Sequence, residues 1–233
     1  MAWRRNVATF STATATDARS RLIEAGLDVF GAQGYAAAST RQLAQRAGVN
    51  LAAIPYHFGG KEGLYRAVIA HIADQLQQRV MPALAGVRQQ LAAGTLDGAQ
   101  AAAAFEQMLA TMVNFIIGTP QARRFARIIV REQMDPSAAF DIIFEQVWRP
   151  ALALASALLA RVKGEATPSR TTALQVYALI GQVLAFRASR ENIVRFLGLE
   201  GYSADETAEI RTVILQQTRL VLIGLGATLR GDA

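Results

Sequence analysis

The sequence predicts an all-α fold of about nine to ten helices. A small N-terminal domain of three helices, which contains a helix-turn-helix, precedes a larger C-terminal helical domain. Hydrophobic residues make up 52% of the 233 residues, charged residues only 18%, and alanine is abundant, a composition that favours close-packed helices. Apolar residues recur at helical spacing in one segment after another. Residues 39–58 add two short helical patterns separated by a glycine.

The N-terminal part divides into an arm and a domain. Residues 1–15 are rich in Thr, Ser and Ala, which is typical of a disordered arm. From Asp17 to Gln33 the apolar residues trace a helical stripe, which Thr16 can cap and Gly34 ends. We therefore expect an arm over 1–15, a helix-turn-helix domain over 16–62 and a second domain over 63–233.

The helix-turn-helix lies in the stretch STRQLAQRAGVNLAAIPYHFGGK, which covers residues 39–61. Ser39 or Thr40 can cap a first helix, Gly48 breaks that helix, and Asn50 can cap a second helix, which the glycine pair at 59–60 ends. Two short helices joined by a three- to four-residue turn with a glycine are typical of motifs whose second helix enters the DNA major groove.

Positive charge is concentrated in the first third of the chain. Residues 1–72 hold eight Lys and Arg against four Asp and Glu, which gives +4, whereas residues 73–233 hold sixteen against fourteen, which gives +2. A basic small domain beside a nearly neutral large one is the charge distribution expected when one end of a molecule binds nucleic acid. A merely solvated basic surface stays open as the alternative.

The chain has no cysteine, so disulfides and thiol catalysis are excluded. Its N-terminus lacks the continuous apolar segment of a signal peptide, and no uninterrupted apolar run reaches the roughly 18 residues that span a bilayer. We expect a cytoplasmic protein without a membrane partner.

Helical patterns fill the rest of the chain, separated by prolines and glycines. The expected helices cover 61–82, 100–118, 121–134, 137–148, 150–163, 170–197 and 205–229. The last two carry seams of small and apolar residues, such as Gly181 and Ala185 in the first and Val213 and Gly224 in the second, which allow helices to approach closely. Periodicity alone leaves open whether these seams form a dimer interface or the core of one monomer.

The stretch from Ala18 to Ile72 resembles the TetR family of bacterial transcriptional regulators. The likeness rests on FGAQGY, STRQLAQRAGV and YHFGGKEGLY in the expected order, and NLAAIPYHFGGKEGLY resembles the CecR-like subgroup. The resemblance implies a homodimer formed through the last two long helices, a palindromic double-stranded DNA operator, and a C-terminal pocket for a small-molecule inducer whose binding releases the DNA.

The resemblance and the local chemistry together give a set of candidate DNA-binding residues. A helix N-terminus with a hydroxyl can hold a phosphate, an arginine can address guanine or the backbone, and small apolar residues can contact thymine methyl groups. Three further residues match family positions that grip phosphates. The set is Thr40, Arg41, Leu51, Ala52, Ala53, Tyr56, His57 and Lys61.

Some of these residues have a structural alternative. Tyr56 can belong partly to the core, and His57 can satisfy a local backbone group. Pro55 departs from the family pattern because it removes a backbone donor about five residues into the second helix. Either that helix begins late enough to tolerate the proline, or its axis bends.

A second set of residues is a candidate ligand pocket in the C-terminal domain. Aromatic residues and methionines on the middle helices can line an apolar cavity, and arginines, together with Glu132, can supply its polar groups. The set is Met108, Met112, Phe115, Phe125, Arg127, Arg131, Phe144, Trp148 and Tyr177. Ordinary core packing is the alternative for each of the apolar members.

These observations favour a ligand-responsive DNA-binding transcriptional regulator, a repressor that a small apolar or amphiphilic molecule releases from its operator. We expect no cofactor, no metal site and no catalytic residue, because the two histidines, His57 and His71, stand apart in the sequence. Two other classes stay open. One is a helical ligand-binding or adaptor protein that has lost DNA binding, and the other is a carboxylate-based enzyme using Glu132 and Asp135.

Overall fold

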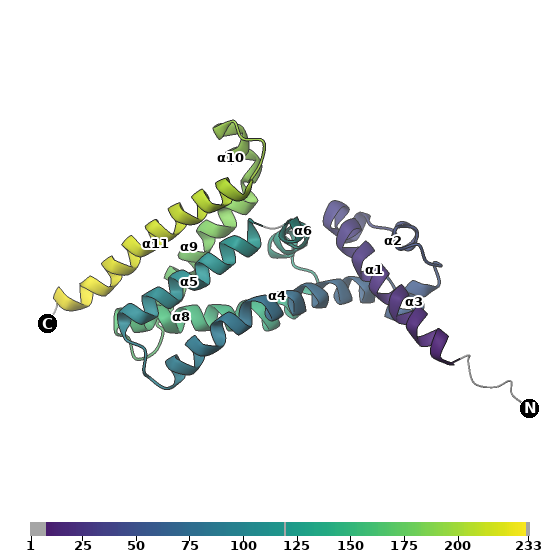
Figure 1. The fold of residues 1–233 in the computed structure, drawn as a ribbon. Coiled ribbons are helices and arrows are strands. Elements are labelled where there is room, and N and C mark those ends of the chain that lie inside the picture. Colours follow the sequence, from purple (N-terminus) through teal and green to yellow (C-terminus); the bar gives the residue numbers. More distant parts are fainter. Residues whose placement is uncertain (1–7, 119, 232–233) are drawn as a thin grey trace, which may run out of the picture. The chain divides into compact units, whose positions relative to one another are not determined.

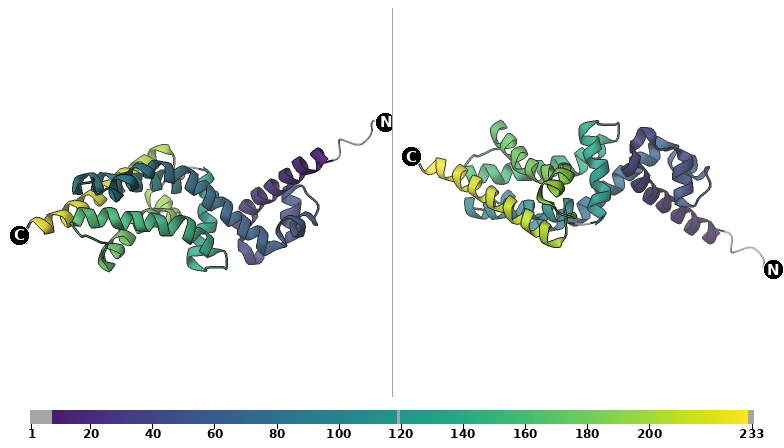
Figure 2. Two further views of the ribbon diagram at one scale, coloured as in Figure 1. Left: turned by 90° about the horizontal axis from the view of Figure 1, so that it is seen from below. Right: turned by 90° about the horizontal axis from the view of Figure 1, so that it is seen from above.

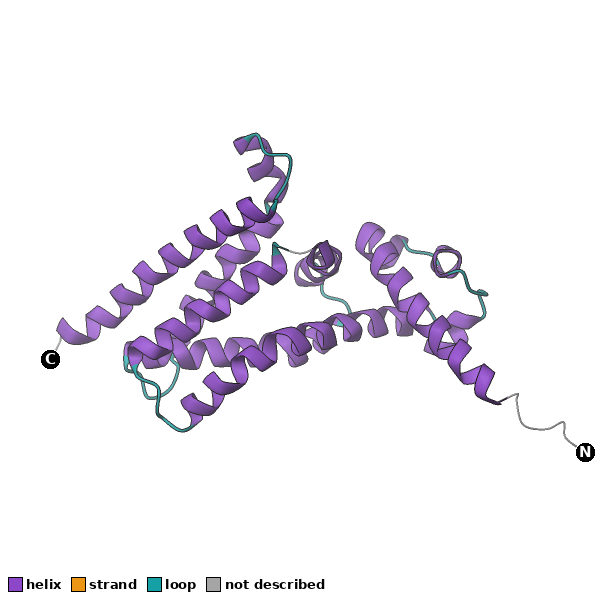
Figure 3. Ribbon diagram, viewed as in Figure 1, coloured by secondary structure: helices purple, strands orange, loops and turns teal. Residues whose placement is uncertain are grey.

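The computed structural model describes residues 8–118 and 120–231, and every regular element within them is a helix (Figure 3). This confirms the all-α fold. The elements are α1 Ala8–Ala37, α2 Thr40–Ala47, α3 Ala53–Phe58, α4 Lys61–Ala92, α5 Gly98–Ile116, α6 Pro120–Met134, α7 Phe140–Ile143, the π-helical segment η1 Phe144–Trp148, α8 Arg149–Lys163, α9 Arg170–Ala188, α10 Arg190–Leu197 and α11 Ala204–Gly231 (Figure 1).

Contacts divide the chain into two compact units. The first comprises residues 1–75 and 127–143, and the second comprises residues 76–126 and 144–233. We call them the N-terminal unit and the C-terminal unit. The division differs from the expected boundary between residues 62 and 63, because most of the first half of α4, the second half of α6 and α7 all belong to the N-terminal unit.

In the N-terminal unit, α1, α2 and α3 pack against one another, and α1 also contacts the start of α4, where the ring centres of Phe30 and Tyr65 lie 4.9 Å apart. Fully buried side chains at Phe30, Leu43, Ile54, Leu64 and Ile69 contribute to its core. The expected disordered arm over 1–15 is wrong for part of its length, because α1 already begins at Ala8, while residues 1–7 lie outside the described residues. Gly34 breaks the helical geometry of α1 as expected, at φ 83° and ψ 171°.

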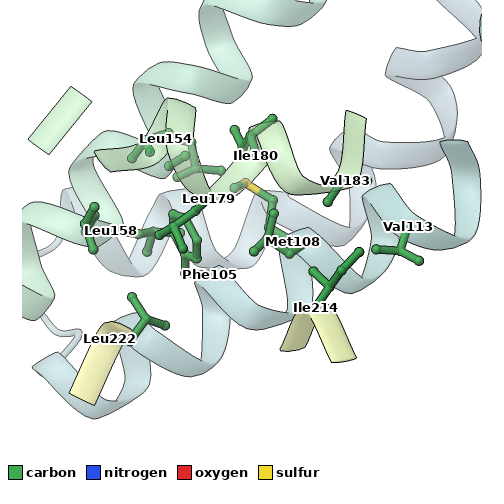
Figure 4. Close-up of a cluster of buried hydrophobic side chains, with 14 of the residues drawn as sticks. Phe105, Met108, Val113, Leu154, Leu158, Leu179, Ile180, Val183, Ile214 and Leu222 are labelled. Carbon is green, nitrogen blue, oxygen red and sulfur yellow. The ribbon is translucent and has the colours of Figure 1, made fainter. Parts of the chain in front are cut away.

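In the C-terminal unit, α5, α8, α9 and α11 lie side by side around a hydrophobic core (Figure 2). Phe105 and Met108 of α5, Leu158 of α8, Ile180 of α9 and Ile214 of α11 point toward one another there (Figure 4). The turn between α8 and α9 is fixed by a polar network. In it, Lys163 and then Thr172 lower the pKa of Glu165 to about 2.

Three differences from the expected helices concern the end of α4, the division between α9 and α10, and the segment before α8. The helix that begins at Lys61 continues past Pro82 to Ala92, and it ends only where Gly94 takes a left-handed conformation at φ 68°. The single helix expected over 170–197 is divided into α9 and α10, because Ser189 leaves helical geometry at φ −94° and ψ 18°.

Proline explains the third difference, the π-helical segment η1 before α8. Pro150 has no N–H, so the carbonyl of Gln146 lacks the donor that a continuous α-helix would supply four residues later. The Nε2 of Gln77 donates to this carbonyl instead, at 2.7 Å. Such π-helical turns are often found at functional sites.

One described stretch, Phe140–Lys163, is long and apolar enough to cross a membrane by length and composition, with a mean hydropathy of 1.3 over its best window. Leu154, Ala155, Leu158 and Leu159 of this stretch lie in the core of the C-terminal unit. Packing in that core accounts for their apolar character.

Candidate nucleic-acid interface

The first helix of the motif is capped at both ends. Ser39 and Gln42 form a capping box, in which the Ser39 Oγ accepts from the Gln42 N–H at 3.2 Å and the Gln42 Oε1 accepts from the Ser39 N–H at 3.0 Å. At the other end Gly48 takes a left-handed conformation at φ 63°, and the N–H of Val49 donates to the carbonyl of Ala44 at 3.0 Å. The caps and the glycine fix the angle between α2 and α3.

Helix α3 begins two residues later than the earliest expected start. Asn50 is therefore not the N-cap of α3, because Ala52 holds that position without a side-chain cap. The Asn50 Oδ1 instead accepts from the N–H of Ala52 at 2.9 Å in the turn before the helix. Pro55 is then the third residue of α3, within the first turn, where backbone N–H groups have no acceptor inside the helix. Pro55 has no N–H to donate to the carbonyl of Leu51, four residues before it. This carbonyl instead accepts from the N–H of Ile54 at 3.3 Å. The helix therefore begins late enough to tolerate the proline.

The candidate DNA-binding residues of α2 and α3 reach solvent to different degrees. Tyr56 exposes 79% of its surface and Leu51 50%, and Arg41 and Ala52 are also exposed. Thr40, Ala53 and His57 are half-buried. Ile54 is fully buried against α1 and α2 and anchors α3 in the unit. The exposure of Tyr56 argues against a core role for that residue.

Arg41 and the other arginines of the N-terminal unit differ in their partners. Arg46 forms an ion pair with Asp28 at 2.8 Å, Arg21 pairs with Asp17 at 3.2 Å, and the guanidinium of Arg19 lies 5.5 Å from the ring centre of Phe58. Arg41 makes no hydrogen bond or ion pair within the described part of the chain. Its guanidinium is available for an external partner.

Lys61 has partners inside the protein. Its Nζ donates to the carbonyl of Ala38 at 2.8 Å and to that of Ala36 at 3.4 Å, and it lies 4.5 Å from the ring centre of Tyr35. These contacts stabilise the end of α1, where backbone carbonyls lack helical donors. A lysine ammonium has three donors, so one is left for a phosphate.

A buried carboxylate ties α4 to the turn between α6 and α7. Glu132 retains 3% of its accessible surface, and its Oε1 accepts from the Tyr65 hydroxyl at 2.5 Å. Its Oε2 accepts from the N–H and the hydroxyl of Ser137, at 3.1 and 3.0 Å. Burial, and then the hydrogen bond to Glu132, raise the pKa of Tyr65 well above its usual value.

Two arginines extend this connection. The Nη1 of Arg131 donates to the carbonyl of Phe30 at 3.2 Å, and the Nη1 of Arg66 donates to that of Ala138 at 3.0 Å. A Cβ at Gly34 would lie 2.3 Å from the Arg131 guanidinium, so a larger residue there would displace this side chain. The sequence patterns gave no sign that α6 packs on the helix-turn-helix domain.

The candidate pocket residues fall in both units. Arg127 and Arg131 belong to the N-terminal unit, whereas the apolar candidates belong to the C-terminal unit. Met108 and Phe125 are buried, Phe125 lies 6.4 Å from Phe115 between ring centres, and Met112, Phe144 and Trp148 are half-buried, whereas Tyr177 is exposed.

Two polar atoms of η1 stand out in the C-terminal unit. The Oε1 of Gln146 and the Nε1 of Trp148 are buried without a hydrogen-bond partner in the described structure. A buried polar atom without a partner is costly and uncommon in native proteins. Sequence reasoning included Trp148 among the candidates but not Gln146.

Comparison with known proteins decides the family. Residues 22–68 match the bacterial regulatory proteins of the tetR family, and residues 101–225 match the C-terminal domain of the HTH-type transcriptional dual regulator CecR. The CecR protein of Shigella flexneri is 33% identical over 210 residues, which cover 89% of this chain and 92% of that protein. The chain belongs to the TetR family. The CecR-like resemblance is confirmed.

Other regulators are similar over shorter stretches or in fold alone. The transcriptional regulator SrpR of Pseudomonas putida is 30% identical over 54% of this chain and 52% of its own length. The crystal structure of SCO4454, a TetR-family regulator from Streptomyces coelicolor, covers 95% of this chain and 98% of its own, with a TM-score of 0.63 at 17% identity. Its likeness extends over both units and shows the fold.

Membership of the TetR family makes this protein a DNA-binding transcriptional regulator, and regulators of the family bind operators as dimers. The carboxylate pair considered for an enzyme is used differently in the structure. Glu132 is bonded to Tyr65 and Ser137, while Asp135 is exposed. Among the described residues there is no group of three His, Cys, Asp or Glu that could hold a metal ion.

Proposed function

We propose that this TetR-family regulator is a cytoplasmic repressor that binds a palindromic operator through α2 and α3 and leaves it when a small molecule binds the C-terminal unit. The observation that supports the DNA-binding part is the exposed surface of a rigidly capped motif, which carries the unpartnered Arg41 together with Leu51 and Tyr56. Arg41 addresses bases or backbone, and Thr40, Tyr56, His57 and Lys61 hold phosphates.

The side chains available for base contacts are few. Leu51, Ala52 and Ala53 offer only apolar surface at the start of α3, and Pro55 is exposed but has no polar group beyond its carbonyl. Part of the sequence preference therefore comes from DNA shape and deformability, which are read through phosphate contacts.

The ligand part of the proposal rests on η1. The unpartnered Gln146 Oε1 accepts a hydrogen bond and the Trp148 Nε1 donates one, so ligand groups of the opposite kind would satisfy them. With Phe144 and Trp148 supplying aromatic surface, the chemistry fits a small, mostly apolar molecule that carries a few polar groups.

The proposed dimer forms through α9 and α11. These helices expose large apolar side chains in the isolated chain, which is unfavourable in water unless a partner covers them. The exposed apolar residues are Leu174 and Tyr177 of α9 and Val213, Leu220, Val221 and Ile223 of α11.

Fluorescence anisotropy tests the DNA-binding part, with the DNA that flanks the protein's own gene and a shuffled duplex of equal length. Affinity for the flanking DNA should fall steeply with salt, because Lys and Arg release counterions from the phosphates. Arg41→Ala should weaken binding and relax the preference for the flanking DNA, since a base contact is worth about 1–3 kcal/mol.

Arg46→Ala is the matched control. It removes a positive charge from the same helix, but one that Asp28 already neutralises, so the sequence preference should be retained. Equal effects of the two changes would remove the base-reading role from Arg41. Salt-independent binding, or no binding, would instead favour an adaptor protein.

A further inference from the structure

Helix α10 has an unusual surface for an ordered element. None of its eight residues is buried, and α9 is the helix of the C-terminal unit on which it packs (Figure 1). Phe196 exposes 88% of its surface and Leu197 58%. Together with Asn192, Ile193 and Arg195 they line an open depression. A phenylalanine that is almost completely exposed on a regular helix lacks the apolar contacts that usually hold such a side chain.

The segment that carries these side chains is held in place. Helix α10 ends at Gly198, which is left-handed at φ 67°, and the N–H of Leu199 donates to the carbonyl of Val194 at 2.9 Å. Beyond it the Tyr202 hydroxyl donates to the carbonyl of Phe186 at 3.1 Å, and the Arg190 guanidinium lies 5.4 Å from the Tyr202 ring centre. These contacts fix α10 to the end of α9, so its apolar side chains face solvent on an anchored helix.

We infer that α10 docks on a second copy of this chain and that Phe196 is buried in the dimer. The inference rests on the proposed dimer, and it extends the interface beyond the two long helices. The exposed apolar surfaces of α9 and α11 belong to the same unit, and α10 is the chain segment that joins these two helices. One two-fold contact that covers α9 and α11 can therefore continue onto α10.

Charge favours a protein partner over a lipid surface. From Arg190 to Glu200 the segment carries two arginines and two glutamates, and Arg195 is already paired with Glu191 at 2.8 Å. Anionic membranes attract helices with several uncompensated basic residues, which this segment lacks. A nearly neutral apolar surface is compatible with an isologous contact, in which the same patch of both copies takes part.

A cysteine introduced at position 196 gives a direct test, because the chain has no cysteine of its own. In Phe196→Cys, the reaction of the thiol with 5,5′-dithiobis(2-nitrobenzoate) should slow as the protein concentration rises through the dimerisation range. Ala103→Cys, at an exposed position of α5, is the control and should react at the same rate throughout. A thiol at position 196 that reacts equally fast in monomer and dimer overturns the inference.

Sedimentation equilibrium gives the second measurement. Phe196→Ser removes a side chain that the monomer does not bury, so the fold should be unaffected while the dimer dissociation constant rises about tenfold to a hundredfold. Glu191→Gln, on the same helix but outside the depression, should leave the constant within about twofold. An unchanged constant for Phe196→Ser would contradict a role of α10 in the dimer.

The outcomes separate this inference from the proposed function. If Leu220→Arg on α11 dissociates the dimer while position 196 stays accessible, the interface of α9 and α11 stands and only the role of α10 fails. If no dimer forms at any concentration, both fail. Protection of the introduced thiol only in the presence of vesicles of anionic phospholipid would replace the second copy by a membrane and overturn the inference.

Discussion

At the scale of single residues, Glu132 is an informative position in the N-terminal unit. A carboxylate that keeps 3% of its surface needs donors, and three are present, from Tyr65 and from the N–H and hydroxyl of Ser137. The sequence offered Glu132 as a pocket group or as part of a catalytic pair. Its observed partners instead make it a fixed point between α4 and the turn after α6.

Tyr65→Phe tests this assignment. The change removes the hydroxyl and leaves one oxygen of Glu132 buried without its donor, so the free energy of unfolding should fall by about 2 kcal/mol. Urea unfolding followed by circular dichroism measures the loss. Tyr35→Phe is the matched control, because Tyr35 lies 5.0 Å from the Tyr65 ring but makes no hydrogen bond through its hydroxyl with a described residue. Equal losses for the two variants would show that the Glu132 contact adds nothing.

At the scale of elements, the angle between α2 and α3 depends on backbone conformation at one position. Gly48 is left-handed, and a Cβ there would meet only the Arg21 guanidinium at 3.9 Å, which is an ordinary contact. Position 48 therefore requires glycine because of its left-handed backbone conformation, and not because a larger side chain would clash. Pro55 acts at the same scale, since its place in the first turn of α3 makes its missing N–H harmless.

Gly48→Ala should lower the free energy of unfolding by about 1–2 kcal/mol, the cost of a left-handed conformation for a residue with a Cβ. DNA binding should weaken as well, because α3 is displaced. Gly86→Ala makes the same chemical change inside α4, where the added methyl meets nothing within 4 Å. There it should raise the free energy of unfolding by about 0.5–1 kcal/mol, because alanine loses less conformational entropy than glycine when a helix forms. Urea unfolding measures both changes. If Gly86→Ala lowered the free energy of unfolding as Gly48→Ala does, the conformational explanation would be contradicted.

At the scale of the whole molecule, DNA binding and dimerisation are expected to depend on each other. A palindromic operator is matched by a two-fold symmetric protein, so each half-site takes one helix-turn-helix. The apolar faces of α9 and α11 would hold the two copies together. A monomer would then engage a single half-site and lose the affinity that joint engagement provides.

Leu220→Arg should convert the dimer to a monomer at micromolar concentration, because it places a charge in an apolar contact, and it should weaken operator binding at least tenfold. Leu220 exposes 70% of its surface in the single chain, so the fold should survive the change. Sedimentation velocity and fluorescence anisotropy measure the two effects. Ala103→Arg adds the same charge at an exposed position of α5, outside the proposed interface, and should leave both unchanged. A Leu220→Arg variant that stays dimeric would place the interface elsewhere.

The sequence by itself determined the local structure of this protein. Helical periodicity, a capping residue at Ser39 or Thr40, and the glycines at 34 and 48 predicted the helix-turn-helix, and the motifs around it predicted the TetR family. These signals are readable because capping and left-handed turns involve residues within a few positions of one another. The candidate DNA-binding residues followed from the same motif, and their roles stay predictions.

Only the tertiary structure decided which distant residues meet. Arg131 donates to the carbonyl of Phe30, and Glu132 accepts from the hydroxyl of Tyr65. Gln77 donates to the carbonyl of Gln146, which Pro150 cannot do because it has no N–H. These partners are 67 to 101 residues apart in the sequence. Periodicity states that a side chain lies on one face of a helix but not which helix covers that face. The same limit applies to Phe196, whose exposure appeared only once α10 was seen as separate from α9.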